Sequence, residues 1–168
     1  MKNKIMTVDG ALTYYLQGLY FAEVKVREAF SVCGKNLSST ELRSELQKYV
    51  DNANDNLLKL ERCFNYLMQD PVERKNEVII KLIEEAHQMS DYASTTNLKD
   101  ILMAGCIQTI SGYKTAAYKT AHLFAIELEL DTVADLLQQI IDWEMETGKS
   151  MSSLSIKEFN RLNRSMQQ

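Results

Sequence analysis

The chain has 168 residues, of which 45% are hydrophobic and 25% charged, and its formal net charge is −4 with both signs spread along the sequence. This composition is typical of a globular protein and predicts one domain with a substantial core. It disfavours a nucleic-acid binder, which would carry a basic face, and no apolar run approaches the roughly 20 residues of a membrane span.

The first half of the chain predicts two long helices. One proline and six glycines leave few turn signals, and such sparse punctuation favours long helices. The first predicted helix covers residues 10–32 and ends near Gly34. The loop "NLSST" follows, with Ser38 and Glu41 at capping-box spacing, and the second predicted helix covers about 40–68.

The second half predicts a short helix and two longer ones. The stretch "DPVE" (70–73) supplies an N-cap Asp and a Pro at the first helical position, and therefore predicts that a third helix starts there and runs to about residue 92. After "STTN" the fourth predicted helix covers 97–125, and after "ELELD" the fifth covers 132–151. Residues 152–168 are expected to be a polar tail, with a short helix near 156–162 and a frayed end.

These elements predict an all-α fold in one domain spanning residues 1–168, with its core at about 10–151. Helices of 25–30 residues would be about 40–45 Å long. Rods of that length joined by short loops pack best as an antiparallel four-helix bundle. The shorter third helix would act as a crossover between the second and the fourth.

Each long helix has a polar interruption at the middle of its apolar stripe. On the fourth helix, residues at helical spacing from Met103 to Phe124 are apolar except Lys114. Glu23 and Glu144 interrupt the stripes of the first and fifth helices, and the second helix carries a Tyr/Asn patch. A charge buried alone costs several kcal/mol or more. Either these groups therefore meet in a shared central cluster, or each charge reaches solvent along its flexible stem.

Inward-pointing carboxylates also raise the question of a metal site. Di-iron bundles hold their metals with Glu and Glu-x-x-His pairs from the core-facing sides of the helices. Glu23 and Glu144 are candidate ligands of this kind. The two histidines of the chain, His87 and His122, lie away from mid-height and are interpreted as surface or boundary residues.

Four segments of the sequence resemble a known family. They are "LYFAE" (19–23), "LIEEAHQM" (82–89), "YKTAAY" (113–118) and "ADLLQQIIDWE" (134–144). Over residues 16–151 the chain is similar to the ferritin-like stress proteins of the bacterial YciE/YciF type. The resemblance implies a ferritin-like bundle, often a dimer, with a two-metal site in many members.

The resemblance carries only part of the metal site into this sequence. Glu23 and Glu144 stand at positions where the family has ligand glutamates. Beside Glu144, however, this chain has Trp143 at a position that is acidic in the family. The family's His-x-x-Glu on the second helix is replaced, and so is its "E-H-Y-E" on the fourth. The vestigial positions are Glu23, Tyr49, Asn52, Ser111, Lys114 and Glu144.

The functional hypothesis rests on Lys114. Its ammonium would offset the two carboxylates and repel a divalent cation by about 4 kcal/mol per unit of metal charge at 4 Å, for an effective dielectric near 20. The sequence therefore predicts no bound metal or other cofactor, no catalytic residues, and a non-catalytic, stress-associated or structural bundle protein. The alternative is a divergent di-iron-type metal-binding protein or ferroxidase that binds iron or manganese through Glu23 and Glu144.

The remaining expectations concern partners and location. Apolar residues on outer helix faces, namely Tyr15, Val24 and Leu57, predict a homodimer, and no nucleic-acid or membrane partner is expected. The first ten residues lack an apolar signal core, which favours a cytoplasmic protein. Its three cysteines are accordingly interpreted as reduced thiols: Cys33, Cys63 and Cys106.

Overall fold

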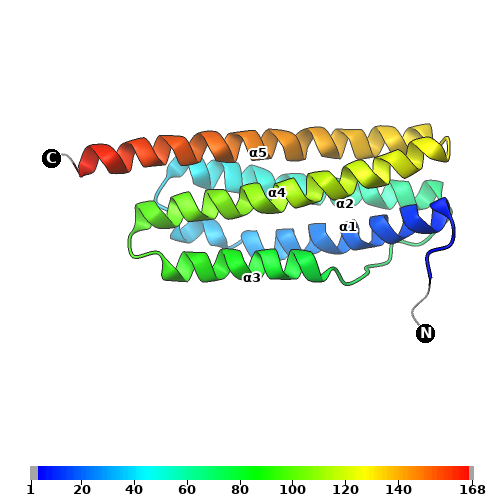
Figure 1. Ribbon diagram of the computed structural model, residues 1–168, viewed down its shortest axis with the longest axis horizontal. Coiled ribbons are helices and arrows are strands. Elements are labelled where there is room, and N and C mark those ends of the chain that lie inside the picture. The colour runs from blue at the N-terminus through cyan, green and yellow to red at the C-terminus, as the bar shows by residue number, and fades with distance from the viewer. Residues whose placement is uncertain (1–3, 167–168) are drawn as a thin grey trace.

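The computed structural model describes residues 4–166, and these form five α-helices and one 3₁₀ turn with no strand among them. Figure 1 shows four long rods side by side, with the shorter α3 along one edge. The predicted all-α bundle with a shorter crossover helix is confirmed. The elements are α1 (Val8–Phe30), η1 (Cys33–Asn36), α2 (Thr40–Tyr66), α3 (Glu77–Tyr92), α4 (Thr96–Glu127) and α5 (Asp131–Ser165).

The four long helices are arranged so that each packs against two antiparallel neighbours. Contacts join α1 to α2 and α4, and α5 to α2 and α4. Because α3 returns the chain along the length of the bundle, α2 and α4 run in the same direction and lie diagonally across the core (Figure 1). Polar side chains from all four helices can therefore meet at one level.

The core consists of two hydrophobic clusters stacked along the bundle axis. The first contains residues such as Leu46 and Ile107, and the second contains residues such as Leu12 and Leu137. Each cluster draws side chains from all four long helices. The polar interruptions seen in the sequence stripes lie between these two apolar layers.

Four of the five α-helices begin at side-chain caps, and α5 begins without one. Thr7, Asn76 and Thr95 each accept a hydrogen bond from a backbone N–H of the first helical turn. The predicted capping box at Ser38 is wrong by one residue, because Ser39 caps α2 and its hydroxyl accepts from the Leu42 N–H at 3.2 Å.

The predicted start of the third helix at "DPVE" is also wrong. Residues 69–76 have no helical structure, and α3 begins at Glu77 behind the Asn76 cap. The segment is held across α1 instead. The backbone N–H of Arg74 donates to the Gln17 carbonyl at 3.2 Å, and its guanidinium lies 3.6 Å from the centre of the Tyr14 ring. These contacts with α1 favour a non-helical backbone over the local start signal.

The predicted frayed tail is wrong for the residues that the structure describes. Helix α5 continues without a break to Ser165. Leu154 joins the first core cluster, Glu158 is buried, and Lys157 pairs with Glu41 of α2 at 2.6 Å. Residues 1–3, 167 and 168, which the predicted domain and tail include, lie outside the described residues.

The three residues predicted to form a dimer contact are less exposed than that prediction requires. Leu57 is only 5% exposed, and Tyr15 and Val24 are half-buried. The neighbouring Leu58 points outward instead.

Within residues 4–166, no helix has the length and apolar character needed to cross a membrane.

Candidate functional site

Lys114 lies at the centre of the bundle, midway along α4, with no solvent exposure. Its Nζ lies 2.8 Å from Glu23 Oε2 on α1 and 2.5 Å from Glu144 Oε1 on α5. The structure thus brings together the three charged residues that interrupt the apolar stripes. We call this group, together with the polar side chains that bind it, the central cluster.

Uncharged donors complete the carboxylates of the central cluster. Tyr118 Oη donates to Glu23 Oε1 at 2.6 Å, and Asn56 Nδ2 donates to the same oxygen at 3.2 Å. Ser111 Oγ lies 2.8 Å from Glu144 Oε2 and 2.7 Å from the Glu144 carbonyl, so its single proton can serve either acceptor. All three donors are fully buried.

Tyr49 closes the cluster from the side of α2. The Lys114 ammonium lies 4.9 Å from the centre of the Tyr49 ring, which is within cation–π range. Two buried atoms of α2, Tyr49 Oη and Asn56 Oδ1, have no hydrogen-bond partner among the described residues. The polar groups that α2 contributes to the cluster are therefore less completely hydrogen-bonded than those from α1 and α5.

Two members of the cluster differ from the sequence prediction. Asn52 is half-buried and makes no side-chain hydrogen bond among the described residues, whereas Asn56, one turn later, supplies the amide. Asn56 lies on the apolar stripe of the second helix, so helical spacing could have found it. Tyr118, which is not among the predicted site positions, follows Lys114 by four residues and therefore shares its helix face.

Burial and charge act in opposite directions on Lys114. Burial alone would lower the pKa of the amine, but Glu144 and Glu23 more than offset this, and the pKa stays well above its ordinary value. Lys114 is therefore an ammonium at any physiological pH.

The pKa of Glu23 is raised, chiefly by burial and further by Glu144, while Lys114 opposes the rise. Burial also raises the pKa values of Tyr118 and Tyr49, so both phenols stay neutral. With both carboxylates ionised, the three charged groups sum to −1.

The donor set does not fit the two-metal centre that the family resemblance implies. Both carboxylates are already engaged by Lys114, and no imidazole is near. His87 is exposed on α3. Within residues 4–166, no three side chains of His, Cys, Asp or Glu gather in a way that could hold a metal ion. A divalent ion here would also face the Lys114 ammonium at contact distance.

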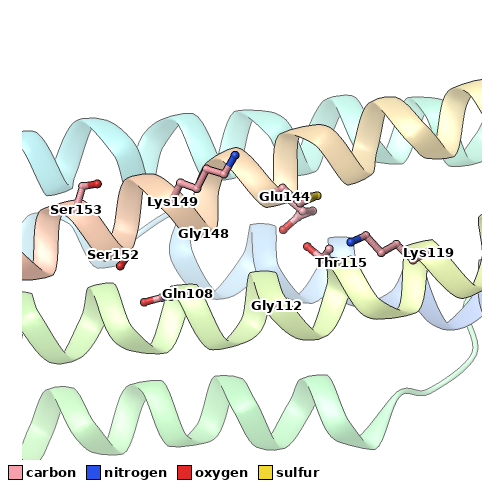
Figure 2. A pocket seen from close by; sticks show the side chains of 10 residues that line it. Gln108, Gly112, Thr115, Lys119, Glu144, Gly148, Lys149, Ser152 and Ser153 are labelled. Carbon is pink, nitrogen blue, oxygen red and sulfur yellow. The ribbon is translucent and has the colours of Figure 1, made fainter.

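Glu144 links the cluster to the surface. Only 2% of this residue is exposed, at the bottom of a groove of about 640 Å³ between α4 and α5 (Figure 2). The groove has both polar and apolar lining and contains two glycines that face outward. Its lining residues are Gln108, Gly112, Thr115, Lys119, Glu144, Met145, Gly148, Lys149, Ser152 and Ser153.

Comparison with known families places the chain. The family described as "Domain of unknown function (DUF892)" matches residues 7–162, nearly the whole chain. The chain belongs to this family. A relative with a curated description, Protein YciF of Escherichia coli strain K12, is 20% identical over 156 residues, which cover 92% of this chain and 94% of YciF.

Solved structures agree with the DUF892 assignment at the level of fold. The E. coli stress protein YciF superposes with a TM-score of 0.87 at 20% identity, covering 95% of this chain and 99% of YciF. YcfI from Rhodopseudomonas palustris, described as a structural protein, superposes with a TM-score of 0.87 at 21% identity. The match covers 90% of this chain and 97% of YcfI. A Xanthomonas campestris protein superposes with a TM-score of 0.73 at 15% identity, and the match covers 96% of this chain and 100% of that protein. The resemblance drawn from the four sequence segments is therefore confirmed.

Proposed function

We propose that this DUF892 chain is a non-catalytic helical bundle with a stress-associated or structural role, in which an ammonium replaces a metal centre. The role is supported by the descriptions of its relatives: YciF as a stress protein and YcfI as a structural protein. The replacement is supported by chemistry. Two family ligand positions keep their glutamates, and a third carries Lys114.

One observation carries the proposal. Lys114 Nζ, fully buried, bridges Glu23 and Glu144 at 2.8 and 2.5 Å. A metal ion at this level would have to displace the ammonium from both carboxylates and then tolerate its charge. In a site of this kind, breaking the existing ion pairs leaves uncompensated buried charge, which is strongly unfavourable.

Metal analysis tests the proposal directly. The protein is to be produced in medium supplemented with iron, manganese and zinc and purified without chelator. We expect a metal content far below one equivalent per chain, and no oxidation of iron(II) above the buffer rate. Near-stoichiometric metal would contradict the proposal and favour the alternative, a ferroxidase-like or other metal-binding protein that uses Glu23 and Glu144 with iron or manganese.

A variant of Lys114 tests the effect of the ammonium on metal binding apart from that of the other polar side chains of the site. Lys114→Glu restores a carboxylate at a family ligand position and removes the repelling charge. If the ammonium excludes metal, this variant binds more divalent ion than the wild type under the same conditions. Lys119→Glu, which makes the same change on the exposed face of α4, serves as the control for non-specific binding.

The proposal includes a reduced, cytoplasmic homodimer. The three cysteines are unpaired, and burial raises the pKa of the Cys63 thiol to about 12, which keeps it unreactive. For the dimer contact we propose outward-facing apolar side chains such as Leu58 and Tyr66 of α2. Light scattering coupled to sizing chromatography measures the mass directly, and a value of one chain, 19.3 kDa, would contradict the dimer.

A further inference from the structure

We propose that the groove between α4 and α5 above Glu144 is a binding site for a small organic dianion. Its volume of about 640 Å³ lies in the range of small-molecule sites, which are about 300–1,000 Å³. Hydroxyl and amide groups line its walls, and two lysines stand over it. The site is separate from the central cluster and shares only Glu144 with it.

The groove carries two lysines that form no ion pair with another described residue. Lys119 and Lys149 are exposed, and neither forms an ion pair with another residue in the range 4–166. Figure 2 shows Lys119 running along α4 toward Thr115, whereas the ammonium of Lys149 lies at the edge of α5 that is farther from α4. The two lysines thus line the groove from different helices, Lys119 from α4 and Lys149 from α5.

Glu144 is the one acid that lines the groove, and its carboxylate is engaged in the central cluster. Its Oε1 is held by Lys114 and its Oε2 accepts from Ser111, while only 2% of the residue is exposed. Both of its carboxylate oxygens are therefore held from inside the bundle, while Lys114 is shared with Glu23 and the three charged groups keep a net charge of −1. A ligand in the groove meets two free ammonium groups and a carboxylate that is already paired.

Two glycines keep the floor of the groove open. A Cβ added at Gly112 or Gly148 would meet no atom within 4 Å, so helix packing does not require glycine at either position. Glycine in a helix interior is less stable than alanine. Open space is instead what the two residues provide, on facing helices and beside the two lysines (Figure 2).

The lining chemistry defines the ligand class. Two ammonium groups in the lining of one groove match two anionic groups, and lysine recognises carboxylate and phosphate alike as a compact point charge. Gln108, Ser152 and Ser153 can hydrogen-bond the part of the ligand between its charged ends. A dicarboxylate and a bisphosphate share this chemistry, and the probes below distinguish them.

Calorimetric titration tests the charge requirement. The probes are succinate and inorganic pyrophosphate, each with two anionic groups, with acetate at matched ionic strength as the monoanion control. We expect saturable binding of at least one of these two probes and none of acetate. In Lys119→Gln/Lys149→Gln the dissociation constant should rise at least about tenfold, because charge-assisted hydrogen bonds are lost. Lys4→Gln/Lys35→Gln, with the same change in net charge at exposed sites outside the groove, should bind as the wild type does.

A second pair of variants tests the open floor. Gly112→Ala/Gly148→Ala should raise the melting temperature by about 2–4 °C per substitution and weaken dianion binding at least tenfold. Gly105→Ala is the control, since its Cβ would also meet open space on α4 outside this groove. It should raise the melting temperature and leave the affinity unchanged. Absent dianion binding, equal loss in either control, or unchanged affinity in the groove variants would each overturn the proposal.

Discussion

At the scale of single residues, the central cluster shows how a bundle can bury a charge. Removing Lys114 from water carries a large desolvation cost, and two carboxylates at hydrogen-bond distance offset it. Each carboxylate also receives uncharged donors, Tyr118 and Asn56 for Glu23 and Ser111 for Glu144. Such an arrangement is stable when complete and costly when one member is removed.

Removing the ammonium should destabilise the protein strongly. We expect Lys114→Ala to lower the free energy of unfolding by about 3–5 kcal/mol, because two buried carboxylates lose their counter-charge. Urea denaturation measures the change. Lys119→Ala on the exposed face of α4 is the control and should stay within about 0.5 kcal/mol of the wild type. The triple variant Lys114→Met/Glu23→Gln/Glu144→Gln, which leaves no charge behind, should be close to neutral. Equal stability of Lys114→Ala and its control would contradict the cluster.

Glu23 should make stability depend on pH. Because its folded-state pKa is raised above the ordinary 4.5, the folded protein holds a proton that the unfolded chain has released. Its contribution to stability is therefore full below pH 4.5 and is lost as pH rises through the folded pKa. Lys114 stays charged throughout this range, since its own pKa is raised.

The variant Glu23→Gln removes this proton uptake. We expect its stability relative to the wild type to improve from pH 5 to pH 8, measured by urea denaturation at both values. Glu127→Gln, an exposed carboxylate on α4, should show no such change. A difference between Glu23→Gln and the wild type that is independent of pH would contradict the raised pKa.

At the scale of elements, the ends of the helices depend on partners distant in sequence. Asp100 of α4 is fully buried and accepts from the Ser38 N–H at 3.0 Å and the Ser39 N–H at 2.7 Å. It also accepts from the Ser38 hydroxyl. One carboxylate thus fixes the entry to α2, including its capping residue.

The loss of this carboxylate should weaken the junction between α2 and α4. We expect Asp100→Ala to cost about 2–4 kcal/mol, because charge-assisted hydrogen bonds disappear and buried backbone N–H groups are left unpaired. Thermal and urea unfolding measure the effect. Asp135→Ala on the exposed face of α5 should change stability by less than about 0.5 kcal/mol. A cost for Asp100→Ala no larger than that of the control would show that Asp100 does not hold the junction.

At the scale of the whole molecule, the two hydrophobic clusters are halves of one folding unit. All four long helices cross both clusters and the polar layer between them. One cluster therefore cannot unfold while the other keeps the four helices that form it.

This arrangement should produce a single cooperative transition. We expect calorimetric and van't Hoff enthalpies of unfolding to agree, and far-ultraviolet circular dichroism and tyrosine fluorescence to change together. A Leu→Ala change in either cluster, at Leu46 or at Leu137, should lower the one transition without splitting it. Two resolved transitions would indicate that the polar layer separates the clusters.

Much of this architecture follows from the sequence. The 3.6-residue period places Glu23, Lys114 and Glu144 on apolar stripes, and the structure brings these three residues together. The amide partner was predicted at Asn52 rather than Asn56, because residues four apart share a helix face. Which of the two reaches the cluster depends on the height at which α2 packs against α1 and α5.

The sequence by itself determined which helix faces are apolar and that a cation interrupts one of them, since these properties depend only on residue type and helical spacing. Tertiary structure alone decided where α3 begins and where α5 ends. Arg74, which contacts α1 from the segment before α3, and Leu154, which packs in the core, override the local start and stop signals. Contacts between distant segments stabilise more than a single helix terminus does. The groove above Glu144 is likewise tertiary, because it exists only where α4 and α5 lie side by side with their glycines outward.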